Sequence, residues 1–110
     1  MNFPDFDQQL PPDTALVQAV QRGEAWAFEP LVDRRLASVH AFVALKLPVA
    51  HLVAELTHET FVAAYRLLPE FTAGTNLRAW LRAIAANLVC KDLGRFHREQ
   101  ANRLGYAERR

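Results

Sequence analysis

Apolar residues recur every three or four positions through most of this chain, and no stretch alternates apolar with polar residues over the length of a strand. A spacing of three or four places side chains on one face of an α-helix, whereas a half-buried strand needs a period of two. Apolar residues make up 51% of the 110 residues, which is enough for a buried core. The sequence therefore predicts a single all-α domain.

Prolines and glycines divide this pattern into segments. Residues 1–12 contain three prolines and no apolar periodicity, so we expect an irregular N-terminal arm. Asp13 is a suitable N-cap for a short first helix that runs through Arg22, and Gly23 is a suitable stop.

A second helix is expected from about Ala25 to Leu47. Its apolar stripe steps by three or four residues and consists of Phe28, Val32, Leu36, Val39 and Val43. Pro30 lies inside this segment, so we expect a kink or a true start between Ala27 and Glu29. Trp26 is expected to pack at the junction of the first two helices.

Pro48 interrupts the chain and opens a third helix, predicted from Val49 to Leu68. The residues expected to face inward are Leu52, Leu56, Thr60, Ala64 and Leu67. The residues expected on the opposite, exposed side are His51, Glu55, His58, Glu59, Val62 and Arg66.

A loop marked by proline and glycine follows over Pro69–Thr75, and Thr75 or Asn76 is expected to cap a long fourth helix. The core stripe of that helix is predicted to contain Leu77, Trp80, Leu81, Ile84 and Leu88, and it can extend to Phe96. Gly94 weakens the helix by about 1 kcal/mol relative to alanine. Residues 104–110 are expected to be a frayed tail or the start of a linker.

Charge is distributed unevenly along the chain. Residues 1–75 contain five Lys and Arg against nine Asp and Glu, whereas residues 76–110 contain eight against three. A basic C-terminal third can bind phosphates, although a solvated basic helix is the more common meaning of such a run. Cys90 is the only cysteine, so it cannot form an internal disulfide, and we expect an inert core thiol in a cytoplasmic protein. No apolar run is long enough to span a membrane, and the acidic start does not have the order of a secretory signal.

An ordered set of short motifs carries more information than any one of them. The set consists of LVQAVQRG (16–23), AFEPL (27–31), ELTHETF (55–61), YR (65–66) and LRAWLRAIAAN (77–87). Over residues 14–98 it resembles region 2 of bacterial RNA polymerase sigma factors of the extracytoplasmic-function (ECF) type. The resemblance implies a compact four-helix region 2 domain over residues 13–103 that acts in transcription initiation, without catalysis and without a cofactor. The second domain of such factors, which reads the −35 element, has no counterpart in these residues.

The resemblance also implies a protein partner for the third helix, namely the clamp helices of the β′ subunit of core RNA polymerase. These helices form a basic coiled coil, so exposed carboxylates with a hydrogen-bonding ring and an apolar neighbour suit them. The residues assigned to this contact are Glu55, His58, Glu59 and Val62. His58 stands where glutamine is usual in the family, and the alternative is an ordinary solvated helix face.

Single-stranded −10 promoter DNA (the non-template strand) is the second partner that the resemblance implies. Capture of a single strand needs cations for the phosphates and a pocket for an extruded base. The residues assigned to DNA are Phe71, Thr75 and Asn76 in the loop, Arg78 and Arg82 one turn apart on the fourth helix, and Asn87, Lys91, Arg95 and Arg98, which continue at spacings of four, four and three as a single polar stripe. Lys91 stands where aspartate is common, and Gly94 interrupts the usual basic cluster. Trp80 lies on the core stripe, so packing is expected rather than a DNA-melting wedge.

Other functions have weaker support in the sequence. Glu55 and His58 have the E-x-x-H spacing of carboxylate-bridged metal proteins, but no second E-x-x-H is evident, so no metal site is predicted. No Ser, His and Asp pattern indicates nucleophilic catalysis, so an enzyme is not expected. An all-α protein-interaction module that never touches DNA remains the alternative. An anti-sigma factor is a further partner that the resemblance implies.

Overall fold

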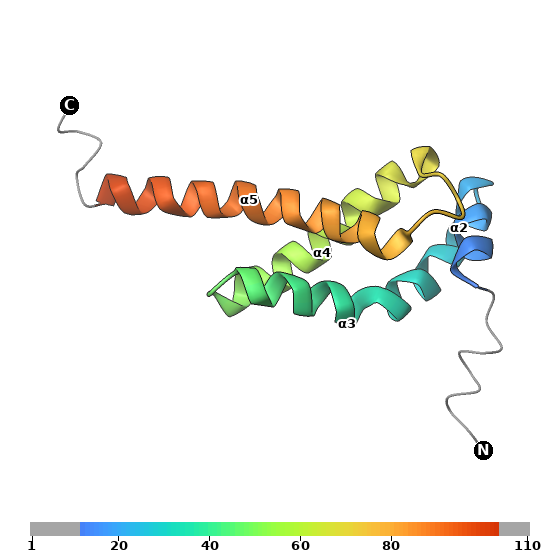
Figure 1. Cartoon of the computed structure of the whole chain (residues 1–110), viewed down its shortest axis with the longest axis horizontal. Helices are drawn as coiled ribbons and strands as arrows, with labels where there is room; N and C mark the ends of the chain where they lie inside the picture. Colours follow the sequence, from blue (N-terminus) through green and yellow to red (C-terminus); the bar gives the residue numbers. More distant parts are fainter. Residues whose placement is uncertain (1–11, 104–110) are drawn as a thin grey trace, which may run out of the picture.

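The computed structural model describes residues 12–103, without the side chains of residues 96, 100, 102 and 103. Within that range the chain forms four α-helices and two 3-10 turns, in the order α2 (Asp13–Gln21), η1 (Ala25–Ala27), α3 (Phe28–Lys46), α4 (Ala50–Leu67), η2 (Leu68–Glu70) and α5 (Leu77–Arg103). Figure 1 shows how the α-helices are arranged. The predicted all-α class is confirmed. The arm expected over residues 1–12, the tail expected over 104–110 and the core role expected for Phe96 lie almost entirely outside the described residues.

The short helix α2 ends where glycine was expected to stop it. Gly23 has a φ of 99°, the left-handed conformation that glycine adopts without steric cost. Its amide donates to the Val20 carbonyl at 2.9 Å, and the Glu24 amide donates to the Ala19 carbonyl at 2.9 Å. This pair of bonds is the Schellman arrangement, which satisfies carbonyls at a helix end. The start differs from the prediction, because Asp13 lies inside α2 and the N-cap position is held by Pro12 without a side-chain cap.

The prolines determine where α3 begins and ends. α3 begins at Phe28, after the 3-10 turn η1, so the predicted late start is confirmed. Pro30 then falls in the first turn, where its missing amide hydrogen would have no helical acceptor. At the other end Leu47 is extended, with φ −117° and ψ 132°, a conformation that the following Pro48 favours because its ring disfavours the helical region for the residue before it.

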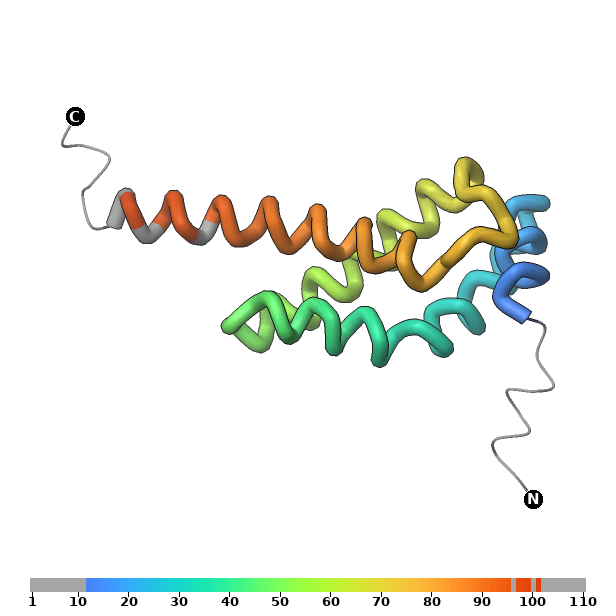
Figure 2. The backbone as a smooth tube through the Cα atoms, viewed as in Figure 1, coloured from blue at the N-terminus to red at the C-terminus, as the bar shows by residue number. Residues whose placement is uncertain are grey.

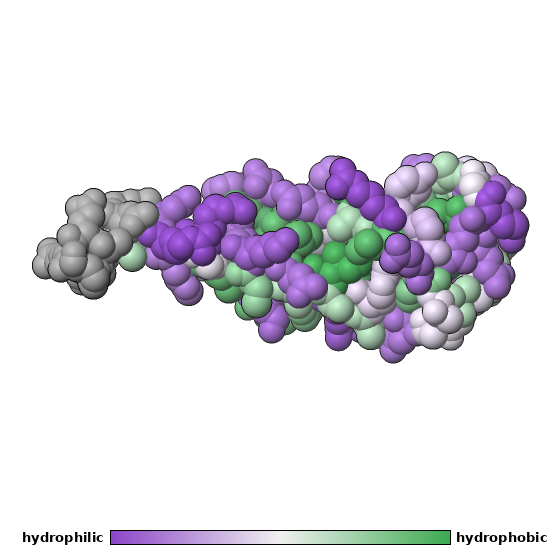
Figure 3. All heavy atoms as spheres, turned by 90° about the horizontal axis from the view of Figure 1, so that it is seen from above, coloured by the Kyte–Doolittle hydropathy of each residue, from purple (hydrophilic) through white to green (hydrophobic). Residues whose placement is uncertain are grey.

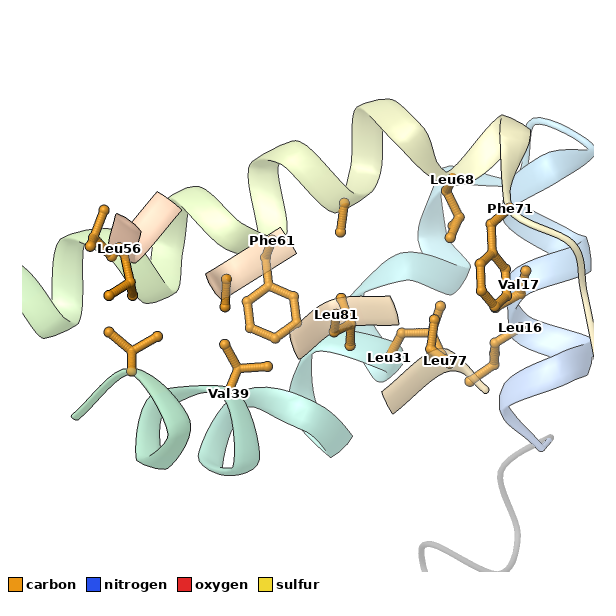
Figure 4. Close-up of a cluster of buried hydrophobic side chains, with 14 of the residues drawn as sticks. Leu16, Val17, Leu31, Val39, Leu56, Phe61, Leu68, Phe71, Leu77 and Leu81 are labelled. Atoms are coloured by element: carbon orange, nitrogen blue, oxygen red, sulfur yellow. The ribbon is translucent and has the colours of Figure 1, made fainter. Parts of the chain in front are cut away.

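The hydrophobic core lies between α3, α4 and α5, and α2 closes one end of it. Figure 4 shows labelled side chains from all four helices pointing toward one another, among them Leu16 and Val17 of α2, Val39 of α3, Phe61 of α4 and Leu81 of α5. Two threonines also lie in this core. The Thr57 and Thr60 hydroxyls each donate to the carbonyl four residues earlier, at 2.7 Å, so their burial leaves no unpaired oxygen.

Four residues that were predicted to be buried are exposed. Leu36 and Leu67 are 45% and 43% exposed, since Leu36 borders a groove between α3 and α4 and Leu67 is the last residue of α4. Trp26 is 61% exposed, and Ala27 is the residue that the same 3-10 turn buries. Cys90 follows the buried Val89 and is exposed, since one step along a helix rotates a side chain by about 100°. These four assignments to the core were therefore wrong.

The helix α5 is much longer than its partners and runs out past the other helices at its C-terminal half (Figures 1 and 2). Figure 3 shows hydrophilic residues gathered over this projecting part, with an apolar area farther along the molecule. No helix among residues 12–103 is both long and apolar enough to cross a membrane.

Candidate functional site

The loop that joins η2 to α5 is held by its own hydrogen bonds. The Thr75 amide and hydroxyl both donate to the Thr72 carbonyl, at 3.2 Å and 2.7 Å. Gly74, between them, has a φ of 94°, a conformation that a residue with a Cβ adopts only with strain. The loop is therefore a defined turn, with the exposed side chains of Thr72 and Thr75 at its rim.

Of the two predicted caps for the fourth helix, Asn76 is the one used. Its Oδ1 accepts a hydrogen bond from the Ala79 amide at 3.0 Å, and its carbonyl accepts one from the Trp80 amide at 3.1 Å. The amides of Leu77 and Arg78 belong to the first turn, where the helix itself offers no acceptor. This end of α5 thus presents N–H donors and the positive end of the helix dipole beside the exposed loop rim.

Two aromatic rings lie beneath the loop. Phe71 is buried and its ring centre is 4.7 Å from that of Trp80, with the rings tilted by 48°. The side chain of Phe71 is thus part of the core, and the contact of Phe71 with DNA stays a prediction. Trp80 is partly buried against the same core, in agreement with its expected packing role.

The polar residues of α5 that were assigned to DNA lie on two sides of the helix. Because an α-helix has 3.6 residues per turn, Asn87 lies about 140° and Lys91 about 180° around the axis from Arg82. Arg78 and Arg82 occupy one side of α5, and Asn87, Lys91 and Arg98 another. All the predicted polar residues are exposed, but the spacing of five between Arg82 and Asn87 separates them into two sets.

The side of α5 that carries Arg82 lies next to α3. Lys46 of α3 therefore contacts the same aromatic ring as Arg82, and the sequence did not identify this second cation. The Arg82 guanidinium lies 5.7 Å from the centre of the Phe42 ring, and the Lys46 ammonium lies 5.2 Å from the same centre. Neither cation has a carboxylate partner within residues 12–103. No sequence signal joins Lys46 to Arg82, because the contact depends on how α3 and α5 pack.

The cations of the second set on α5, namely Lys91, Arg95 and Arg98, differ in their contacts. Arg95 lies 3.2 Å from Asp92, a carboxylate that is itself buried, so part of its charge is already neutralised. The Arg98 guanidinium reaches back over Gly94, to within 3.6 Å of the point that a Cβ would occupy there. Lys91 is exposed and has no carboxylate partner in the described part of the chain. Lys91 and Arg98 are thus the cations of this set that are available to an anion.

The stripe predicted on the third helix is present on α4. Glu55, His58, Glu59 and Val62 are exposed and share one face of a continuous helix. His58 also lines two adjoining hollows between α3 and α4, of about 570 and 370 Å³, which share Val32, His58 and Phe61. Together they form an open groove, mostly apolar, with Leu36 on its α3 side.

Metal binding has no structural support in the described residues. Within residues 12–103 no three His, Cys, Asp or Glu side chains come close enough to hold an ion. Among those residues the Glu55 and His58 pair lacks the additional carboxylates that a carboxylate-bridged site requires.

Comparison with known proteins agrees with this geometry. Residues 31–99 match the family model described as Sigma-70 region 2. The chain is 39% identical over 75 residues to the ECF RNA polymerase sigma factor BldN of Streptomyces coelicolor, an alignment that covers 67% of this chain and 28% of that protein. It is 36% identical over 75 residues to the ECF RNA polymerase sigma-E factor of Escherichia coli K12, which covers 68% of this chain and 39% of that protein.

A solved structure is similar over nearly its whole length. It is an engineered region 2 of sigmaE, determined by NMR in complex with GTAAAA, with a TM-score of 0.76 and 32% sequence identity. The match covers 83% of this chain and 95% of that one. The chain itself spans between 28% and 39% of the length of the two curated relatives above. On the family match and these relatives, the chain belongs to the Sigma-70 region 2 family, as a region 2 domain of the ECF type.

Proposed function

We propose that this domain initiates transcription by binding core RNA polymerase and capturing the −10 element of a promoter as a single strand. The observation that carries the proposal is the similarity to a region 2 that was solved in complex with GTAAAA, at 32% identity over 95% of that chain. The protein would act without catalysis and without a cofactor, in the cytoplasm at the nucleoid.

The DNA-binding part of the proposal rests on the N-terminal end of α5. Thr75 and Asn76 stand at the loop rim beside first-turn amides, where base edges and phosphates can find donors and acceptors. Arg78 and Arg82 lie one turn apart on the helix that follows, and both are exposed. In this proposal the loop reads an extruded base, and the arginines bind phosphates.

The other α5 residues assigned to DNA can bind only a second stretch of the DNA strand, away from the part that Arg82 binds. Asn87, Lys91 and Arg98 lie on a different side of the helix from Arg82, so one extended strand reaches both sets only by crossing α5. Arg95 contributes less in this proposal, because Asp92 already pairs with it.

The polymerase-binding part rests on α4. Glu55 and Glu59 stand one turn apart and are exposed, next to the groove that His58 and Val62 border. A basic coiled coil can place arginines on these carboxylates and an apolar side chain in the groove. An anti-sigma factor is a further partner that membership of this family suggests, and we assign no residue to it.

Copurification tests the proposal. The tagged domain is mixed with core RNA polymerase and with a fluorescent −10-like single strand, and each is measured in the recovered complex. Recovery of both partners is expected. Recovery of polymerase without any retention of the strand would favour the protein-interaction module instead, and recovery of neither would refute the proposal.

A further inference from the structure

The side chain of Gln21 joins α2 to the start of the loop. Its Nε2 donates to the carbonyl of Leu68 at 2.9 Å and to that of Phe71 at 2.7 Å. The two acceptors are 47 and 50 residues away along the chain, and the amide is partly buried. Both hydrogens of the side-chain amide are therefore used on the backbone that leads into the loop.

The position of Gln21 is itself fixed on both sides. It is the last residue of α2, and the turn at Gly23 that follows is closed by two backbone hydrogen bonds. The first residue of α2 is held as well: the Asp13 carboxylate accepts from Arg34 at 2.7 Å and from the Arg35 Nε at 3.0 Å. The helix α2 is thus bonded to α3 at its first residue and to the backbone before the loop at its last residue. Figure 2 shows α2 at this end of the molecule.

The backbone held by Gln21 is the base of the proposed recognition loop. Phe71 immediately precedes Thr72, whose carbonyl accepts both hydrogen bonds of Thr75. Phe71 also carries the ring that packs on Trp80. A shift of the Phe71 carbonyl therefore moves the rim residues and the ring beneath them together.

We propose that Gln21 is a positioning residue that holds the loop at residues 71–76 in its base-reading conformation, so that α2 contributes to the sequence preference of the domain without touching DNA. The second part of this proposal, the contribution to sequence preference, rests on the proposed function. The first part, the fixing of the loop, is a property of the free protein and is tested separately.

The test uses Gln21→Glu, which keeps the shape of the side chain but places a carboxylate against two carbonyl oxygens. Gln21→Met, of similar length, removes the donors without adding charge and serves if the first variant does not fold. The matched control is Gln18→Glu, which adds the same charge to an exposed position of the same helix.

Loop order is measured without DNA. Hydrogen exchange of the Phe71 and Thr75 amides, which donate to the Leu68 and Thr72 carbonyls, is expected to become about tenfold faster in both Gln21 variants and to stay unchanged in the Gln18 control. Emission of Trp80, read in a Trp26→Phe background so that the exposed second tryptophan does not contribute, is expected to shift with the Phe71 contact. Unchanged exchange and emission in folded Gln21 variants would overturn the proposal.

Sequence preference is measured with core polymerase present, as the ratio of affinities for a −10-like strand and a scrambled strand. The ratio is expected to fall about tenfold in the Gln21 variants, equivalent to about 1.4 kcal/mol. The salt dependence of binding should stay unchanged, because no phosphate contact is lost. A faster-exchanging loop with an unchanged ratio would refute the role in preference. A wild-type domain that shows no preference would instead contradict the proposed function, while the exchange data still decide the positioning role.

Discussion

Replacement of Asp13 by asparagine tests how α2 is held against α3. The carboxylate pairs with both Arg34 and Arg35, and these three side chains are only 19%, 16% and 31% exposed. Hydrogen bonds to a charged partner contribute about 1.5–3 kcal/mol, and asparagine keeps the shape while losing the charge and one acceptor oxygen. We expect the free energy of unfolding to fall by about 2 kcal/mol, a substantial share of the stability of a domain of this size.

The pH dependence of the stability difference between wild type and Asp13→Asn gives a second check. Burial raises the pKa of Asp13, but the hydrogen bonds and charges of Arg35 and Arg34 outweigh it and hold the pKa below its ordinary value of 3.8. A carboxyl whose folded-state pKa is lowered stabilises the fold at pH values above its unfolded pKa, and that stabilisation is lost as the pH falls through the folded pKa. The difference in the free energy of unfolding between wild type and Asp13→Asn should therefore be largest at neutral pH and should decrease as the pH falls below about 4.

The assay is urea unfolding followed by circular dichroism between pH 7 and pH 3. The control is Asp33→Asn, which makes the same chemical change at an exposed position on α3, and it should change stability by less than about 0.5 kcal/mol. If Asp13→Asn is as stable as wild type at pH 7, or if the difference does not depend on pH, the reasoning about this ion pair is wrong.

Three further changes test other parts of the account. Reversal of Glu55 and Glu59 to lysine should weaken polymerase binding by more than tenfold in a pull-down titration with helicity unchanged, and wild-type affinity would contradict the assignment. Trp80→Ala should cost about 3 kcal/mol in urea unfolding, because the ring is only partly buried, and a loss below about 1 kcal/mol would place it outside the core. Asn76→Asp should preserve the cap of α5 and its stability, whereas Asn76→Ala should lose about 1 kcal/mol; equal unfolding midpoints for the two variants would exclude the capping role.

Local signals explain why the helices could be predicted from the sequence. Gly23 stops α2 because a left-handed residue is needed there, and Pro30 sets the late start of α3 because it fits only the first turn. Asn76 caps α5 through a bond three residues away. Each of these effects depends on a few neighbouring residues, so each is visible in the order of amino acids.

Features that depend on packing between helices could not be predicted in the same way. Asp13 has the residue type of a cap, yet it is placed by two arginines more than twenty residues away. The contact between Lys46, Phe42 and Arg82 and the two hydrogen bonds of Gln21 join segments that nothing in the sequence pairs. The separation of Arg82 from Asn87 on α5 is different in kind, because the spacing of five between them indicates a change of helix face in the sequence itself.

The measurement that tests the central claim most directly is a salt titration of −10-like and scrambled single strands bound to the complex of this domain with core polymerase. Arg82→Ala should weaken binding of both strands alike and flatten the slope of log affinity against log salt concentration by about 0.7, the value for one phosphate contact on a single strand. Thr75→Ala should leave the slope unchanged and remove the preference for the −10-like strand, because base contacts carry sequence information and phosphate contacts do not. If the two variants change slope and preference in the same way, or if the wild-type complex binds both strands equally, this domain does not read a promoter through the loop and the N-terminal end of α5.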